Sequence, residues 1–179
     1  MSPQHFTTAV IATATLLFPL LAWAPVTERV KVSGRHTMTV AREHQLVIGD
    51  HPAHVLFLSE AGGINRNTGA TTWMERSTLV SVGSADLVAG TGPHQGYIIE
   101  VESGDTSYVR WSGHVTTTIA EGKAPSTSFE GQWTKSGGSG RFRGVTGAGT
   151  YRGRFTSPTQ YTTDWSGELA LPKGDTSAR

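Results

Sequence analysis

A short pattern occurs four times in the second half of the chain, and it restricts the fold more than any other feature. Each copy reads large apolar, polar, Gly, polar, large apolar, and the copies are residues 111–115, 129–133, 151–155 and 165–169. On a β-strand, the two large residues and the glycine share one face, and the polar pair shares the other. Glycine weakens a strand, so its repeated use needs a geometric reason. A tightly curved, closing sheet supplies one, because glycine permits the bend and bulky neighbours fill the space beside it.

The rest of the chain supports an all-β fold. Apolar residues recur with period two, as in Val30, Val32, Met38 and Val40, which fall on one parity. Turn-forming sequences lie at residues 49–50, 67–69, 90–93, 103–105, 121–123 and 135–140. They divide the chain into about eight short strands, which is typical of an antiparallel barrel or sandwich. With the glycine pattern, we predict a single small antiparallel β-barrel. For residues 41–48, a short helix or a connecting loop is the alternative to a strand.

The N-terminus has the pattern of a secretory signal. The first 24 residues contain no Lys, Arg, Asp or Glu, and the apolar run 9–24 ends in Ala22-Trp23-Ala24. This small-x-small ending predicts a helical signal peptide over residues 1–24 that is removed on export, although its first residues lack a basic side chain. An uncleaved membrane anchor is the alternative, but the run is shorter than the roughly 20 residues of a spanning helix. We therefore expect a secreted or periplasmic protein without stable membrane insertion.

Composition narrows what the exported chain can do. The barrel domain is expected over residues 25–171, followed by a polar, flexible tail at 172–179. The chain has no cysteine, which excludes thiol nucleophiles, thiolate metal sites and disulfides. Its net charge of +1, with both signs interspersed, provides no basic surface for nucleic acid. Nucleic acid is therefore not expected as a partner.

Three motifs that suggest chemistry do not meet its requirements. The glycine-rich run 137–149 lacks the Gly-Lys-Ser/Thr of a phosphate loop, and no helix pattern follows it. The Gly-x-Ser-x-Gly pattern of a serine hydrolase is absent. Residues 50–54 hold Asp50, His51 and His54, but no second cluster of metal ligands is evident. We expect no metal and no cofactor.

Polar residues on the inward parity are the better candidates for a site. His36 continues the apolar face of Val32 and Met38, either as a general acid or base or as a hydrogen-bonded core histidine. Glu60 follows Leu58 on one parity, either as a carboxylate at the cavity floor or as a strand-end residue in water.

The remaining candidates are aromatic or lie in a loop. Residues 92–97 are expected to form a turn at the barrel mouth, where His94 and Tyr97 can contact a ligand. Trp73 and Trp111 either line an apolar cavity or fill the core. In contrast, the polar residues of the repeated pattern are expected on the outer wall: Ser112, His114, Glu130, Gln132, Arg152, Arg154, Ser166 and Glu168.

The same residues carry a family resemblance over about a quarter of the chain. Phe-Glu-Gly-Gln-Trp at 129–133, the Gly-rich run 140–153 and Asp-Trp-Ser-Gly-Glu-Leu at 164–169 resemble the C-terminal half of bacterial allene oxide cyclase-like barrels, a group similar to plant dirigent proteins. The resemblance implies an eight-stranded, often oligomeric barrel whose apolar cavity holds small lipophilic molecules. Family members cyclise a fatty-acid epoxide, steer radical coupling or have no assigned activity. None of the cyclase's catalytic polar residues matches a position here.

Two functions of different classes follow. The leading hypothesis is an exported barrel that binds a small, mostly apolar ligand in its interior, and the sequence leaves open whether it also acts as an isomerase or cyclase. The alternative is a non-enzymatic structural or interaction protein that acts through its outer surface. Interior volume separates the two, because a barrel of about eight strands either fills its interior with side chains or holds one small ligand.

Overall fold

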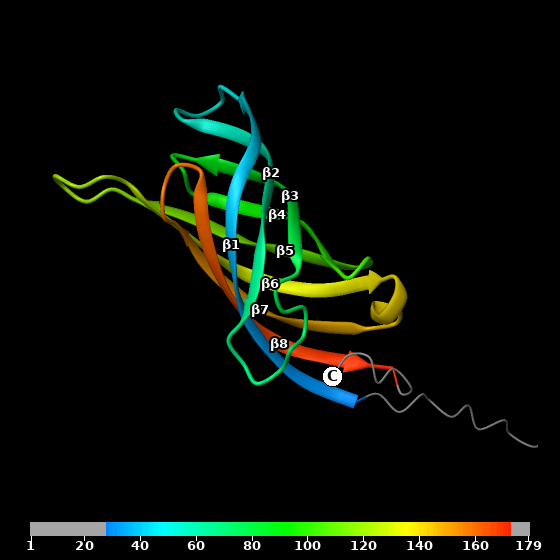
Figure 1. Cartoon of the computed structure of the whole chain (residues 1–179). Helices are drawn as coiled ribbons and strands as arrows, with labels where there is room; N and C mark the ends of the chain where they lie inside the picture. Colours follow the sequence, from blue (N-terminus) through cyan, green and yellow to red (C-terminus); the bar gives the residue numbers. More distant parts are fainter. Residues whose placement is uncertain (1–27, 173–179) are drawn as a thin grey trace, which may run out of the picture.

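The computed structural model describes residues 28–172, which form eight β-strands and one short 3-10 helix (Figure 1). The strands are β1 (Glu28–Val47), β2 (His54–Asn67), β3 (Thr78–Val88), β4 (Gly92–Glu102), β5 (Asp105–Thr118), β6 (Ser126–Gly138), β7 (Thr146–Phe155) and β8 (Gln160–Leu171), and the helix η1 spans Gly140–Phe142. Each strand pairs antiparallel with the next, and β8 pairs with β1 to close the barrel. The predicted all-β, eight-stranded antiparallel barrel is confirmed.

Residues 28–172 contain no α-helix, and no helix among them is long and apolar enough to cross a membrane. The predicted signal peptide, residues 1–24, lies outside the described residues, as does the predicted tail after Pro172.

The alternative left open for residues 41–48 is excluded, and the turn predicted at residues 92–97 is wrong. Residues 41–48 form neither a helix nor a loop, because β1 continues to Val47 in register with the start of β2, with Leu46 opposite Leu56. Residues 92–97 are not a turn but the beginning of β4, and the chain reverses earlier, at Ala89 and Gly90. In both cases pairing with a neighbouring strand overrides the local composition.

The glycines of the repeated pattern lie directly under aromatic side chains. Gly113 and Gly131 are paired across β5 and β6, and a Cβ atom at Gly113 would lie 2.7 Å from the Tyr151 hydroxyl. Gly149 and its partner Gly167 lie under Trp133 in the same way, with a Cβ at Gly149 only 2.6 Å from the indole ring. The glycines therefore provide the room that inward aromatic rings need in a tightly curved wall.

One end of the barrel is closed by packed side chains. The β2–β3 loop inserts Trp73, whose ring packs edge-on against Phe142 of η1 at 5.2 Å. Buried Asn65 holds this loop by donating to the Met74 carbonyl at 2.8 Å and accepting from Trp165 Nε1 at 3.0 Å. Toward the other end, the interior is lined by exposed side chains such as Glu43.

Candidate functional site

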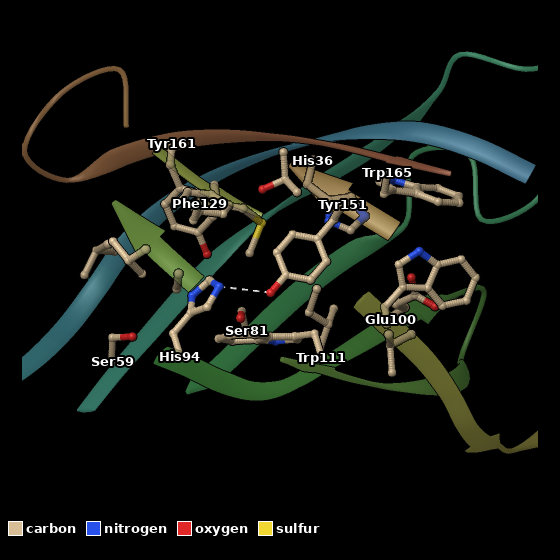
Figure 2. Close-up of a pocket in the computed structure, with 18 of the residues that line it drawn as sticks. His36, Ser59, Ser81, His94, Glu100, Trp111, Phe129, Tyr151, Tyr161 and Trp165 are labelled. Carbon is tan, nitrogen blue, oxygen red and sulfur yellow. Dashed lines mark hydrogen bonds between the residues drawn. The ribbon is translucent and has the colours of Figure 1, made fainter. Parts of the chain in front are cut away.

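The barrel interior holds a cavity of about 230 Å³. All eight strands contribute to its wall, which is mostly aromatic and aliphatic (Figure 2). An apolar cavity of about 150 Å³ accepts benzene, and drug-sized ligands occupy roughly 300–1,000 Å³. The space therefore suits a molecule of one or two rings.

Four of the six predicted site residues line this cavity: His36, Trp73, His94 and Trp111. They come from β1, the β2–β3 loop, β4 and β5, so closure of the sheet brings together residues that are distant in the sequence. Parity predicted the inward orientation of His36 correctly, since Val32 and Met38 on the same face also line the cavity.

Glu60 and Tyr97 lie on the outer wall, so neither reaches the cavity. In β2 the inward residues are Phe57, Ser59 and Ala61, and Glu60 points outward, where its carboxylate lies 3.6 Å from Arg42. Glu60 does share a face of β2 with Leu58, as its parity predicted, but this face is the outer, exposed face of the barrel. Tyr97 is 49% exposed because its neighbours Gly96 and Ile98 take the inward positions.

The polar residues of the repeated pattern follow the expected alternation. Glu130 and Arg152 are direct neighbours on the outer faces of β6 and β7, and Arg152 is also opposite Asp164. These groups are exposed, so they contribute solubility and little stability.

His94 and Tyr151 form a hydrogen-bonded pair on the cavity wall, drawn as a dashed line in Figure 2. The Tyr151 hydroxyl lies 3.0 Å from His94 Nε2, and the His94 ring also hydrogen-bonds the Glu130 backbone. Burial lowers the pKa of His94 to about 4 and raises the pKa of Tyr151. At neutral pH the pair therefore consists of a neutral imidazole and a protonated phenol, each already partnered.

His36 is buried on the cavity wall beside the Trp165 ring, at 5.7 Å between ring centroids. Burial lowers the pKa of His36 to about 4, while the charge of Glu100 acts in the opposite direction. His36 Nε2 has no hydrogen-bond partner among the described residues. The ring is thus a neutral polar group with unused hydrogen-bonding capacity.

A buried ion pair at the closed end of the cavity was not predicted from the sequence. Glu100 Oε2 accepts from Lys135 Nζ at 2.9 Å and from the Ser107 hydroxyl at 2.8 Å. Lys135 Nζ also lies 5.1 Å from the centre of the Trp73 ring, within cation–π range. The alternation of Ile98 and Glu100 in β4 is the signal for Glu100. The turn predicted at residues 135–140 begins too early, because β6 continues to Gly138 and contains Lys135.

The Asp50–His54 segment forms a local hydrogen-bonded cluster on the barrel rim. His54 Nδ1 contacts the Asp50 carboxylate, and Nε2 lies 2.6 Å from Asp86. Both ring nitrogens are thus engaged, and hydrogen bonds to Asp86 and Asp50 raise the pKa of His54. Within residues 28–172, no group of three or more His, Cys, Asp or Glu side chains is arranged to hold a metal ion.

Comparison with known proteins identifies related folds only. No family model matches the sequence, and no curated protein matches it either. Two solved structures of pterocarpan synthase dirigent proteins, GePTS1 and PsPTS1, are similar to this chain. The match to GePTS1 has 10% sequence identity and a TM-score of 0.45, and it covers 90% of this chain and 100% of GePTS1. The match to PsPTS1 has 11% sequence identity and a TM-score of 0.45, and it covers 82% of this chain and 97% of PsPTS1. Both structures are of dirigent proteins, the plant group named above for its similarity to allene oxide cyclase-like barrels. At these identities and TM-scores, the matches carry no argument about what this chain binds.

Proposed function

We propose that this protein binds a small, mostly apolar molecule inside its barrel. The observation that carries the proposal is the 230 Å³ cavity, because a barrel of this size can instead be packed solid. Its lining includes Trp111, Phe129, Trp133 and Trp165, and aromatic rings of this kind offer large apolar contact surfaces.

The cavity would favour an apolar body over a charged one. Burying a charge without a partner is costly, and the charged pair at the closed end, Glu100 and Lys135, is already neutral as a unit. An isomerisation or cyclisation of the bound molecule would extend this function, since holding a flexible molecule in one reactive conformation needs few reactive side chains. Export to the periplasm or medium would place the barrel where it meets such molecules outside the cytoplasm.

Indane, a bicyclic hydrocarbon, is a suitable first probe. We expect it to shift the indole NMR signals of Trp111 and Trp133, which line the cavity. The matched variant Ala61→Phe places a ring in the cavity from a buried inward position and should abolish the shifts. Equal shifts in both proteins would place the binding elsewhere and contradict the proposal.

The interaction-protein alternative is favoured by a separate observation on the outer wall. Leu58, Val82 and Tyr97 are exposed on the neighbouring strands β2, β3 and β4, and they line a shallow outer groove together. Exposed apolar groups of this kind are typical of interaction sites. Light scattering of the purified protein tests this: a stable oligomer that Tyr97→Glu dissociates would support a role for this face.

A further inference from the structure

The cavity has a polar end, here called the polar floor and defined as His36, Glu100 and Lys135. All three side chains line the cavity, and each residue is 6–7% exposed. In Figure 2, Glu100 and Trp165 both lie toward one end of the cavity, and Ser59 and His94 lie toward the other. Glu43, which lines the cavity toward the other end, is exposed, so a ligand meets buried charged groups only at the closed end among the residues that line the cavity.

Two pairs of polar groups on the wall already bond each other. The Tyr151 hydroxyl bonds His94, and Tyr161 hydrogen-bonds Ser81. The polar floor has hydrogen-bonding capacity left, as does Trp111 Nε1, a buried donor on the wall that has no partner among the described residues. Lys135 has three N–H groups, of which one is donated to Glu100 and another can face the Trp73 ring, so a third is left over. His36 Nε2 has no partner among the described residues.

The charge balance of the floor limits what can bind there. The ammonium of Lys135 and the carboxylate of Glu100 offset each other at 2.9 Å, and His36 is neutral at physiological pH. A carboxylate on the ligand would add a buried charge without a counter-charge, which is strongly unfavourable. A neutral carbonyl oxygen adds no charge and can accept hydrogen bonds from the unpaired N–H donors of the polar floor.

We propose that the polar floor of His36, Glu100 and Lys135 selects an uncharged ligand with a carbonyl group at one end of an apolar ring body, such as a cyclic ketone or lactone. The inference rests on the proposed binding function and specifies its ligand class. The carbonyl oxygen accepts from Lys135, and the apolar body extends along Val109 and Trp133 toward the mouth.

Three probes of nearly equal size test the proposal: indane, 1-indanone and indane-1-carboxylate. By calorimetry, we expect 1-indanone to bind roughly ten-fold more tightly than indane, as for one hydrogen bond to a charged group. The carboxylate should bind more weakly than both. A ketone no tighter than indane, or a carboxylate tighter than the ketone, would overturn the inference. No binding of any probe would overturn the proposed function as well.

The double variant Glu100→Gln/Lys135→Met tests the residues themselves. Both charges are removed together because losing one partner leaves the other buried and uncompensated. We expect this variant to lose the preference for the ketone over indane. The matched control Glu60→Gln/Arg42→Met removes an exposed ion pair on the outer wall and should keep the preference. A preference that survives the double variant contradicts the assignment.

An infrared measurement on the native protein does not depend on any variant folding. The carbonyl stretch of bound 1-indanone should fall below its frequency in an alkane solvent, as a hydrogen-bonded carbonyl does. A stretch equal to that in alkane would show that the oxygen has no donor and would overturn the proposal.

Discussion

Acidification should destabilise the barrel through His36. The group has an ordinary pKa of 6.5 in the unfolded chain and a pKa of about 4 in the folded protein, because burial disfavours the charged ring. Between these values the unfolded chain binds more protons than the folded protein, so stability present above pH 6.5 is lost as the pH falls toward 4. From pH 7 to pH 5, this one group should lower the free energy of unfolding by about 2 kcal/mol.

The assay is urea unfolding at pH 7 and pH 5, compared between the native protein and His36→Gln, which removes the titrating ring. We expect the native protein to lose about 2 kcal/mol more than the variant over this interval. The control Thr163→Val alters a buried, non-titrating neighbour opposite His36 on β8 and should lose as much as the native protein. Equal losses of unfolding free energy in the native protein and His36→Gln would refute the reasoning, because protonation of the buried ring would then not be coupled to unfolding.

Two further predictions test the wall and the rim. Gly131→Ala should cost about 1–3 kcal/mol of unfolding free energy in urea, because its Cβ would collide with the Ser112 carbonyl oxygen and lie 2.5 Å from the Tyr151 hydroxyl. The control Gly62→Ala, whose nearest atom is a carbonyl oxygen at 4.0 Å, should be close to neutral, and similar costs at both sites would contradict the close-approach argument. On the rim, His54 should titrate by NMR with a pKa above 6.5, and Asp86→Asn should lower that pKa. The stability that protonated His54 contributes is fully present below pH 6.5 and is lost as the pH rises through the pKa of His54 in the folded protein. An unchanged His54 titration in Asp86→Asn would contradict the role of that carboxylate.

The barrel itself could be predicted because its signals are local. Alternation fixes which residues share a face, and glycines between large residues indicate tight curvature, so strand identity and closure follow from short stretches of sequence. Alternation alone does not say which of two faces is inward. Glu60 shows this, since Leu58 on its face is exposed while Ser59 on the opposite face lines the cavity.

The pairing of distant residues could not be predicted from the sequence. Glu100 and Lys135 meet because β4, β5 and β6 are neighbours in a particular register, with a shift between Tyr108 and Val109. That register depends on the whole closed sheet rather than on either residue's surroundings in sequence. The His94–Tyr151 pair, 57 positions apart, has the same origin.

Native mass spectrometry of the protein purified from its natural compartment tests the central claim most directly. The barrel should carry a reproducible additional mass of a small molecule, or acquire one from an apolar extract, and the cavity-filled variant Ala61→Phe should carry none. A bare native chain after exposure to such extracts, or the same additional mass on Ala61→Phe, would contradict binding inside the barrel.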